Sequence, residues 1–261
     1  MKIVRIRTDG DEIVYGGAEP EGIRVYRGTP FVAWEPTETV VPFEEAHLLA
    51  PVFPTKVVGV GRNYVDHAAE RSAEVPEEPL IFLKPATSVI GPLASIALPP
   101  GVEEVHHEAE LAVVIGTVAK NVALEDVGAH VLGYTAANDI SARELQDRDG
   151  QWARAKGFDT FCPVGPWIET ELEYTDTMIT CTVNEQMRQM ASTRDMIFSV
   201  REIIAFISSV MTLEPGDLIL TGTPAGVSKL SPGDEVTVEI EGIGSLTNVV
   251  RKDEQIKNSE T

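Results

Sequence analysis

Residues 106–115 read His106-His107-Glu108-Ala109-Glu110-Leu111-Ala112-Val113-Val114-Ile115, and a glycine follows. The apolar and β-branched residues in the second half of this run, ended by glycine, predict a buried β-strand. Side chains alternate along a strand, so Glu108 and Glu110 share one face, roughly 7 Å apart. Neighbouring carboxylates repel each other unless a cation lies between them. The spacing alone therefore fits either a solvated strand face or a cation site.

The composition limits the classes of partner. The 261 residues are 43% hydrophobic, enough for a large core, and carry a net charge of −20. So acidic a chain is not expected to bind nucleic acid or an anionic membrane surface. An apolar leader and a run of about 18 apolar residues are both absent from the sequence, which predicts no signal peptide and no membrane span. The two cysteines, Cys162 and Cys181, fit a reduced, cytoplasmic protein.

The pattern of short strands predicts an α+β chain. Residues 1–54 are expected to form a small N-terminal β domain, in which 36–54 is a linker with a short helical piece. Residues 55–261 are expected to form a larger domain. Its one long amphipathic helix is predicted at 195–211, where apolar residues keep helical spacing. The regular strand–helix alternation of a doubly wound sheet is missing, so the sheet is expected to be antiparallel or mixed.

A histidine and a glutamate are predicted on one face of a short helix near residue 65. Asn63 is a suitable helix cap, and His67 and Glu70 are three residues apart. A carboxylate beside an imidazole orients the ring and raises its basicity. The same pair could also be an ordinary ion pair on a surface helix.

Five motifs occur in an order that resembles the fumarylacetoacetate hydrolase family over roughly residues 55–250. They are Gly61-Arg62-Asn63-Tyr64 with His67 and Glu70, His107-Glu108-Ala109-Glu110-Leu111, Asn138-Asp139-Ile140-Ser141-Ala142-Arg143, Lys156-Gly157-Phe158-Asp159 and Thr221-Gly222-Thr223-Pro224. The resemblance implies a mixed β-sandwich roll and a homodimer. It also implies Mg²⁺ or Mn²⁺ held by Glu108, Glu110 and Asp139, and hard divalent cations do prefer such oxygen ligands.

The resemblance implies three catalytic residues. Lys156 matches the family's active-site lysine, which stabilises developing negative charge. His67 and Glu70 match a dyad carried on a lid helix in hydrolytic and decarboxylating relatives. In isolation, Lys156 could equally be a surface lysine and Asp139 a turn-capping aspartate.

Four further residues are candidates for substrate binding. Arg143 and Gln146 lie one turn apart on a helix predicted at 141–148, and could reach an anion held by the metal. Gly222 and Thr223 could offer a backbone N–H and a hydroxyl to a carboxylate. A solvated helix face and a plain turn are the alternatives.

The predicted function is metal-dependent C–C bond cleavage of small 2-oxo acids through a metal-bound enolate. With an acylpyruvate, His67 oriented by Glu70 would activate water. With oxaloacetate, carbon dioxide would leave without a nucleophilic water. Two alternatives stay open: an isomerase or decarboxylase acting on 2-hydroxyhepta-2,4-diene-1,7-dioate, and a non-catalytic metal-containing binding protein. The dyad weighs against isomerisation.

Overall fold

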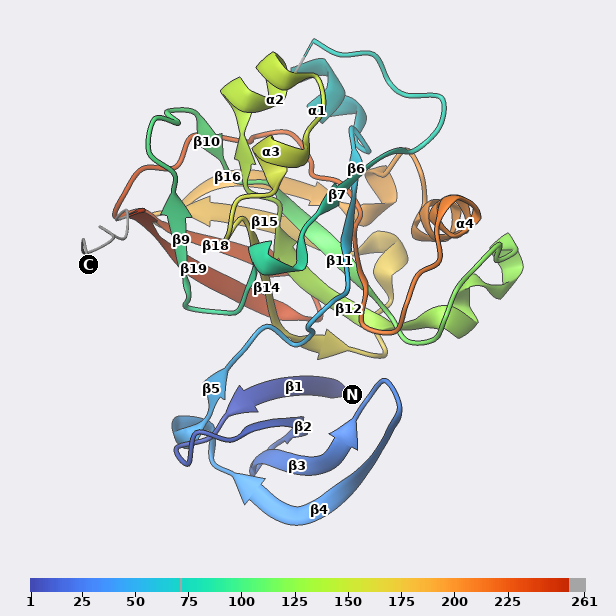
Figure 1. The fold of residues 1–261 in the computed structure, drawn as a ribbon, viewed down its shortest axis with the longest axis vertical. Coiled ribbons are helices and arrows are strands. Elements are labelled where there is room, and N and C mark those ends of the chain that lie inside the picture. The colour runs from blue at the N-terminus through green and yellow to red at the C-terminus, as the bar shows by residue number, and fades with distance from the viewer. Residues whose placement is uncertain (71, 254–261) are drawn as a thin grey trace, which may run out of the picture.

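Two β-sheets packed face to face make up most of the molecule (Figure 1). The computed structural model describes residues 1–70 and 72–253, so Arg71 and residues 254–261 of the predicted second domain lie outside the described part. Strands outnumber helices, and the larger sheet is mixed, so the α+β prediction is confirmed.

The larger sheet has the order β4-β3-β2-β1-β14-β12-β11-β17-β6-β7, with β5 paired to β1 and β8 to β14. Its strands are β1 (Lys2–Arg7), β2 (Ile13–Glu19), β3 (Gly22–Thr29), β4 (Ala33–Val41), β5 (His47–Leu48), β6 (Val57–Gly61), β7 (Leu80–Lys84), β8 (Val89–Ile90), β11 (Ala109–Ile115), β12 (Val131–Asn138), β14 (Cys162–Glu169) and β17 (Leu218–Leu220). Neighbours are antiparallel except in two pairs, β17 with β6 and β14 with β8.

The smaller sheet has the order β16-β15-β18-β19-β9, and β10 and β13 form a separate short pair. Their bounds are β9 (Ser95–Leu98), β10 (Val105–His106), β13 (Ser141–Ala142), β15 (Met178–Val183), β16 (Gln186–Ser192), β18 (Glu235–Ile240) and β19 (Gly244–Lys252).

Strand β11 lies at the centre of the hydrophobic core, and all seven of its residues are buried. Leu111 and Val113 point into the core that β11 shares with the smaller sheet. Ala112 and Val114 point to the opposite face, against a second cluster. A strand covered on both faces needs apolar residues at every position, which explains the unbroken run after Glu110.

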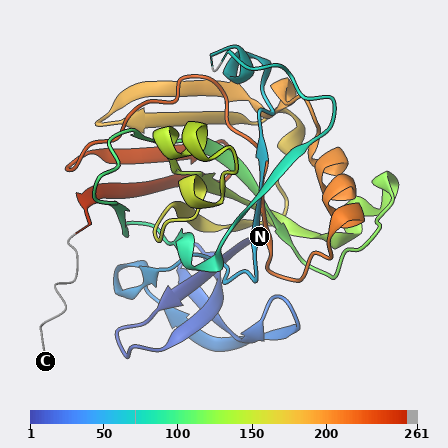
Figure 2. The ribbon, with the colours of Figure 1, turned by 45° about the horizontal axis from the view of Figure 1, so that its top comes forward.

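The helices are short and gather in two places (Figures 1 and 2). Helices α2 and α3 pack against each other, α1 lies apart from them at the same end of the sheets, and α4 packs beside the 3₁₀ segment η3 on a flank. Their bounds are α1 (Val65–Glu70), α2 (Arg143–Asp149), α3 (Ala153–Lys156), α4 (Val200–Val210), η1 (Phe43–Glu45), η2 (Ala86–Ser88), η3 (Leu124–His130), η4 (Tyr174–Asp176) and η5 (Thr193–Asp195). No helix within the described ranges has the length and hydropathy needed to span a membrane.

Two helix predictions were wrong at their N-terminal ends. The helix predicted at 195–211 begins only at Val200, because Ser199 and Glu202 form a capping box: each side chain accepts the other residue's backbone N–H. The helix predicted at 141–148 begins at Arg143, because Ser141 pairs with His106 in the short β10–β13 sheet.

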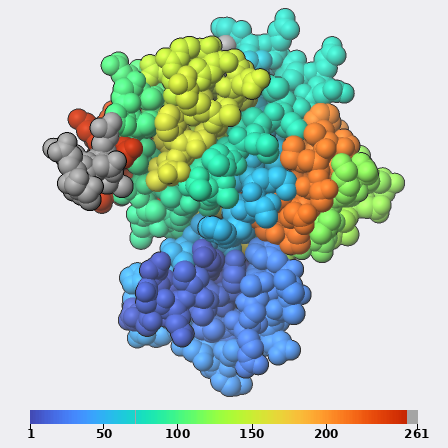
Figure 3. Space-filling model, viewed as in Figure 1, coloured from blue at the N-terminus to red at the C-terminus, as the bar shows by residue number. Residues whose placement is uncertain are grey.

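The N-terminal strands form a lobe with its own small core, seen in blue in Figure 3. The lobe is joined to the main body by hydrogen bonding, since Ile3 of β1 pairs with Ile168 of β14. The predicted linker at 36–54 was partly wrong, because β4 continues through Pro36 to Val41. Proline is tolerated there because β4 is an edge strand. The division into 1–54 and 55–261 stays a prediction.

Candidate active site

The register of β11 against β12 brings three acidic residues together. Ala109 pairs with Asn138. Just beyond this pair, the Asp139 N–H donates to the Glu108 carbonyl at 2.8 Å, and the Glu108 N–H donates to Asn138 Oδ1 at 2.9 Å. One carboxylate oxygen from each of Glu108, Glu110 and Asp139 lies within 4.8 Å of the others. The three predicted ligands therefore form one cluster.

Three buried cations surround this carboxylate cluster. Lys156 Nζ lies 2.6 Å from Glu108 Oε2 and 2.5 Å from Asp139 Oδ2. Arg143 Nη2 lies 2.5 Å from Glu108 Oε1. Lys84, which the sequence analysis missed, lies 2.6 Å from Asp139 Oδ1. The available signal was a lysine directly after four apolar residues of a predicted strand, because a lysine that is buried there needs an anionic partner.

Glu108 and Glu110 sit in opposite electrostatic surroundings. Burial alone would raise the pKa of Glu108, but Arg143 and Lys156 outweigh it and hold that pKa well below its usual value. Burial raises the pKa of Glu110 well above its usual value, and the charges of Asp139 and Glu108 add to the effect. Burial also opposes the charge of Lys156, but Asp139 and Glu108 prevail and raise the pKa of its ammonium group.

Glu110 makes the acidic cluster suitable for a cation. Within the described residues its carboxylate has no ion-pair partner, and its contact is the Gly222 N–H, 2.6 Å from Oε2. Three buried carboxylates offer the hard oxygen donors that Mg²⁺ and Mn²⁺ prefer. The donor set therefore fits a divalent ion, which would also stabilise the ionised form of Glu110.

The predicted dyad lies on α1 at the edge of the same site. His67 Nδ1 is 3.2 Å from Glu70 Oε2, and Glu70 Oε1 accepts the Gly226 N–H at 3.1 Å. Burial lowers the pKa of His67, although Glu108 and Glu70 partly oppose this effect. The imidazole is therefore neutral near pH 7, and with Nδ1 turned to Glu70, Nε2 remains for the cavity.

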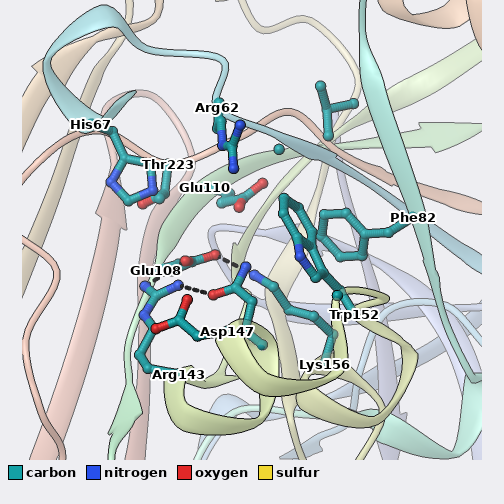
Figure 4. A pocket seen from close by; sticks show the side chains of 14 residues that line it. Arg62, His67, Phe82, Glu108, Glu110, Arg143, Asp147, Trp152, Lys156 and Thr223 are labelled. Carbon is teal, nitrogen blue, oxygen red and sulfur yellow. Dashed lines mark hydrogen bonds and ion pairs between the residues drawn. The ribbon is translucent and has the colours of Figure 1, made fainter. Parts of the chain in front are cut away.

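These groups line a cavity of about 290 Å³ (Figure 4). This volume lies at the lower end for ligand pockets and suits a small substrate. The cavity has acidic, basic and aromatic walls, formed mainly by Arg62, His67, Phe82, Glu108, Glu110, Arg143, Gln146, Trp152, Lys156 and Thr223.

Three of the four predicted substrate-binding residues line the cavity. Arg143 and Gln146 line the cavity and contact each other, Nη1 to Oε1, at 2.9 Å. The buried Arg143 Nε has no hydrogen-bond partner in the described part of the chain. Thr223 lines the cavity, but its hydroxyl already donates to the Ala109 carbonyl at 2.9 Å. Gly222 is not part of the cavity wall, and its N–H serves Glu110.

Asn63 has a role that differs from the prediction. Its side chain does not cap α1: Oδ1 accepts the Phe198 N–H at 2.7 Å, and Nδ2 donates to the Thr221 carbonyl at 2.7 Å. A Cβ at Gly222 would lie 2.6 Å from the Asn63 Cβ, and Gly222 has φ +97°. The buried amide therefore fixes the turn whose N–H holds Glu110.

Comparison with known proteins identifies related chains. The family model described as "Fumarylacetoacetate (FAA) hydrolase C-terminal" matches residues 56–251, and one described as "Rv2993c-like, N-terminal" matches residues 1–51. Protein Rv2993c of Mycobacterium tuberculosis is 53% identical over 215 residues, which cover 81% of each chain.

Two further relatives have functional names. The human mitochondrial oxaloacetate tautomerase FAHD2B is 47% identical over 224 residues, covering 81% of this chain and 71% of that protein. The crystal structure of a 2-hydroxyhepta-2,4-diene-1,7-dioate isomerase from Mycobacterium marinum superimposes with a TM-score of 0.90. It is 44% identical and covers 97% of this chain and 99% of that one.

Proposed function

Since the chain belongs to the fumarylacetoacetate hydrolase family, we propose that it is a divalent-metal-dependent enzyme that interconverts the keto and enol forms of small 2-oxo acids of the oxaloacetate kind. The observation that carries this proposal is the His67 imidazole, whose pKa is lowered by burial, on the wall of a small cavity whose other side gathers buried cations and carboxylates. Such a site offers a base that can take a proton from the carbon beside the 2-oxo group. It also offers positive charge that stabilises the resulting enolate.

Glu108, Glu110 and Asp139 would hold the ion, Mg²⁺ or Mn²⁺. When bound, it would supply Lewis-acid polarisation of the 2-oxo group. The substrate carboxylate would contact Arg143 and the side-chain amide of Gln146, which line the same wall.

The protein's own residues would move the proton. His67 Nε2 takes a proton from C3 of the keto acid, and the electron pair of that bond moves so that negative charge develops on the 2-oxygen. Glu70 stabilises the imidazolium through Nδ1. The Lys156 ammonium, protonated because its pKa is raised, donates a proton to the 2-oxygen and gives the enol. Exchange with water restores both groups, so the net change is one proton moved from carbon to oxygen.

C–C bond cleavage is the second candidate, and the His67–Glu70 dyad favours it. With an acylpyruvate, His67 would take a proton from water as the water attacks the distal carbonyl. The C3–C4 bond would then break and leave the pyruvate enolate, which takes a proton at C3. Decarboxylation of oxaloacetate would reach the same enolate without that water.

A substrate panel with Mg²⁺ and with Mn²⁺ separates these reactions. Tautomerisation is followed by the ultraviolet absorbance of the enol, and cleavage by release of pyruvate. We expect enol absorbance to change faster with the protein than without it, and His67→Ala to abolish that effect while the protein still binds oxalate, a mimic of the enolate. Pyruvate release at a comparable rate would favour cleavage. Bound metal without turnover of any 2-oxo acid would favour a non-catalytic binding protein.

A further inference from the structure

Arg62 lines the cavity but has no role in the chemistry proposed above. We propose that its guanidinium binds the second carboxylate of the substrate, so that the enzyme selects 2-oxo dicarboxylic acids over monocarboxylic ones. This inference rests on the proposed function and adds a determinant of specificity to it.

The first observation is the backbone of Arg62. It follows β6 directly and has φ +60°, a left-handed conformation that few non-glycine residues adopt. Such conformations persist where the surrounding structure enforces them, and they cluster at functional sites. Here the conformation directs the side chain from the end of β6 into the cavity (Figure 4).

The second observation is the lack of an anionic partner. Arg143, Lys156 and Lys84 each lie within 2.6 Å of a carboxylate oxygen. Arg62 has no ion pair or hydrogen bond to any residue in the ranges 1–70 and 72–253, although acidic residues outnumber basic ones 41 to 21 in this chain. Glu108, Glu110 and Asp147 line the same cavity, but none of them pairs with Arg62. A partly buried guanidinium on a cavity wall without an ion-pair partner is a site for an anionic ligand.

The third observation is the arrangement of charge along the cavity. Lys156 and Arg143 come from the α2–α3 side, whereas Arg62 enters from the opposite side (Figure 4). Phe82 and Trp152 form an aromatic wall, with their ring centroids 5.3 Å apart. A cavity with positive charge on two sides and an apolar wall matches a short carbon chain with a carboxylate at each end.

The test compares oxaloacetate, whose distal carboxylate is ionised, with its 4-methyl ester, whose distal group carries no charge, and refers each rate to the uncatalysed rate of the same compound. In the wild type we expect kcat/KM to favour the diacid by roughly 10- to 100-fold, the range for one charge-assisted hydrogen-bonded contact. Arg62→Gln should remove most of that preference by lowering kcat/KM for oxaloacetate while the ester is little affected. Oxalate lacks a distal group, so its affinity in the presence of Mn²⁺, measured by calorimetry, should be the same in both proteins.

Arg148→Gln is the matched control. Arg148 lies on α2, is 64% exposed and is not part of the cavity wall, so this variant should keep the diacid preference. A preference that persists in Arg62→Gln, or an equal loss for both substrates, overturns the role of Arg62 alone. A wild-type protein that converts neither substrate and binds no oxalate overturns the proposed function, and the inference with it.

Discussion

Glu110 differs from its two acidic neighbours because, within the described residues, it forms no ion pair with a cation. Glu110→Gln should therefore weaken Mn²⁺ binding by more than the roughly 10- to 100-fold typical of losing an outer-shell partner. Calorimetry measures the affinity directly. Mn²⁺ should also raise the melting temperature of the wild type, since ligands that bind only the folded state stabilise it.

Glu104→Gln provides the control for that experiment. Glu104 is exposed and pairs with Lys229 outside the acidic cluster, so its loss should leave Mn²⁺ affinity unchanged. Equal affinity in wild type and Glu110→Gln would show that Glu110 is not a ligand.

The dyad gives a pH dependence with a defined sign. If neutral His67 is the base, kcat/KM falls as the pH drops through a pKa that burial places below the usual value near 6.5. The Glu70 carboxylate opposes this lowering, because it favours the imidazolium. Glu70→Gln should therefore shift the acid limb of the kcat/KM profile to still lower pH. If the acid limb does not move, the group that titrates there is not His67.

Comparison of Gly222 with Gly233 separates the cost of backbone strain from the cost of side-chain crowding. Gly222 and Gly233 have φ +97° and +95°, but a Cβ meets Asn63 at 2.6 Å only at Gly222, and nothing within 4 Å at Gly233. Alanine at either position should cost about 1–2 kcal/mol for the left-handed backbone. Gly222→Ala should cost more, measured by urea unfolding, and should also weaken Mn²⁺ binding through the Glu110 contact. Equal losses would mean that the Asn63 contact relaxes at no cost.

At the scale of elements, one aspartate joins the beginnings of two parallel strands. The buried Asp217, just before β17, accepts the N–H groups of Thr55 and Lys56 at 3.1 Å and the Thr55 hydroxyl at 2.7 Å, and it pairs with the Lys56 ammonium. These residues lead into β6, so Asp217 fixes the β17–β6 register on which Arg62 and Asn63 depend.

Asp217→Ala should lower the free energy of unfolding by roughly 2–4 kcal/mol, because it leaves buried donors and a cation without their partner. The matched control is Asp234→Ala, since Asp234 ends a second Pro-Gly-Asp turn but contacts Ser231 and Asn184 at the surface. Denaturant unfolding of both variants makes the comparison. A loss no greater than that of Asp234→Ala would refute the structural role of Asp217.

At the scale of the whole molecule, β7 is the last strand of the larger sheet and carries exposed apolar side chains. Leu80 is 39% and Leu83 48% exposed, and both line an apolar groove beside the active-site cavity. An apolar edge strand favours association with a second chain. We therefore expect the predicted homodimer, with a mass by light scattering of twice 28.3 kDa. Leu83→Glu should shift it towards the monomer, and a monomeric wild type would contradict the prediction.

The sequence by itself determined the parts that depend on local geometry. The unbroken apolar run predicts the buried strand β11, the two-residue spacing places Glu108 and Glu110 on one side, and the order of the motifs was sufficient to recognise the family. The tertiary structure alone decided which distant groups meet. Lys84 lies 55 residues from its partner Asp139, and Asn63 lies 158 residues from Thr221. No local pattern encodes such pairs, because they depend on strand register and on which side chains the packed sheets bury together.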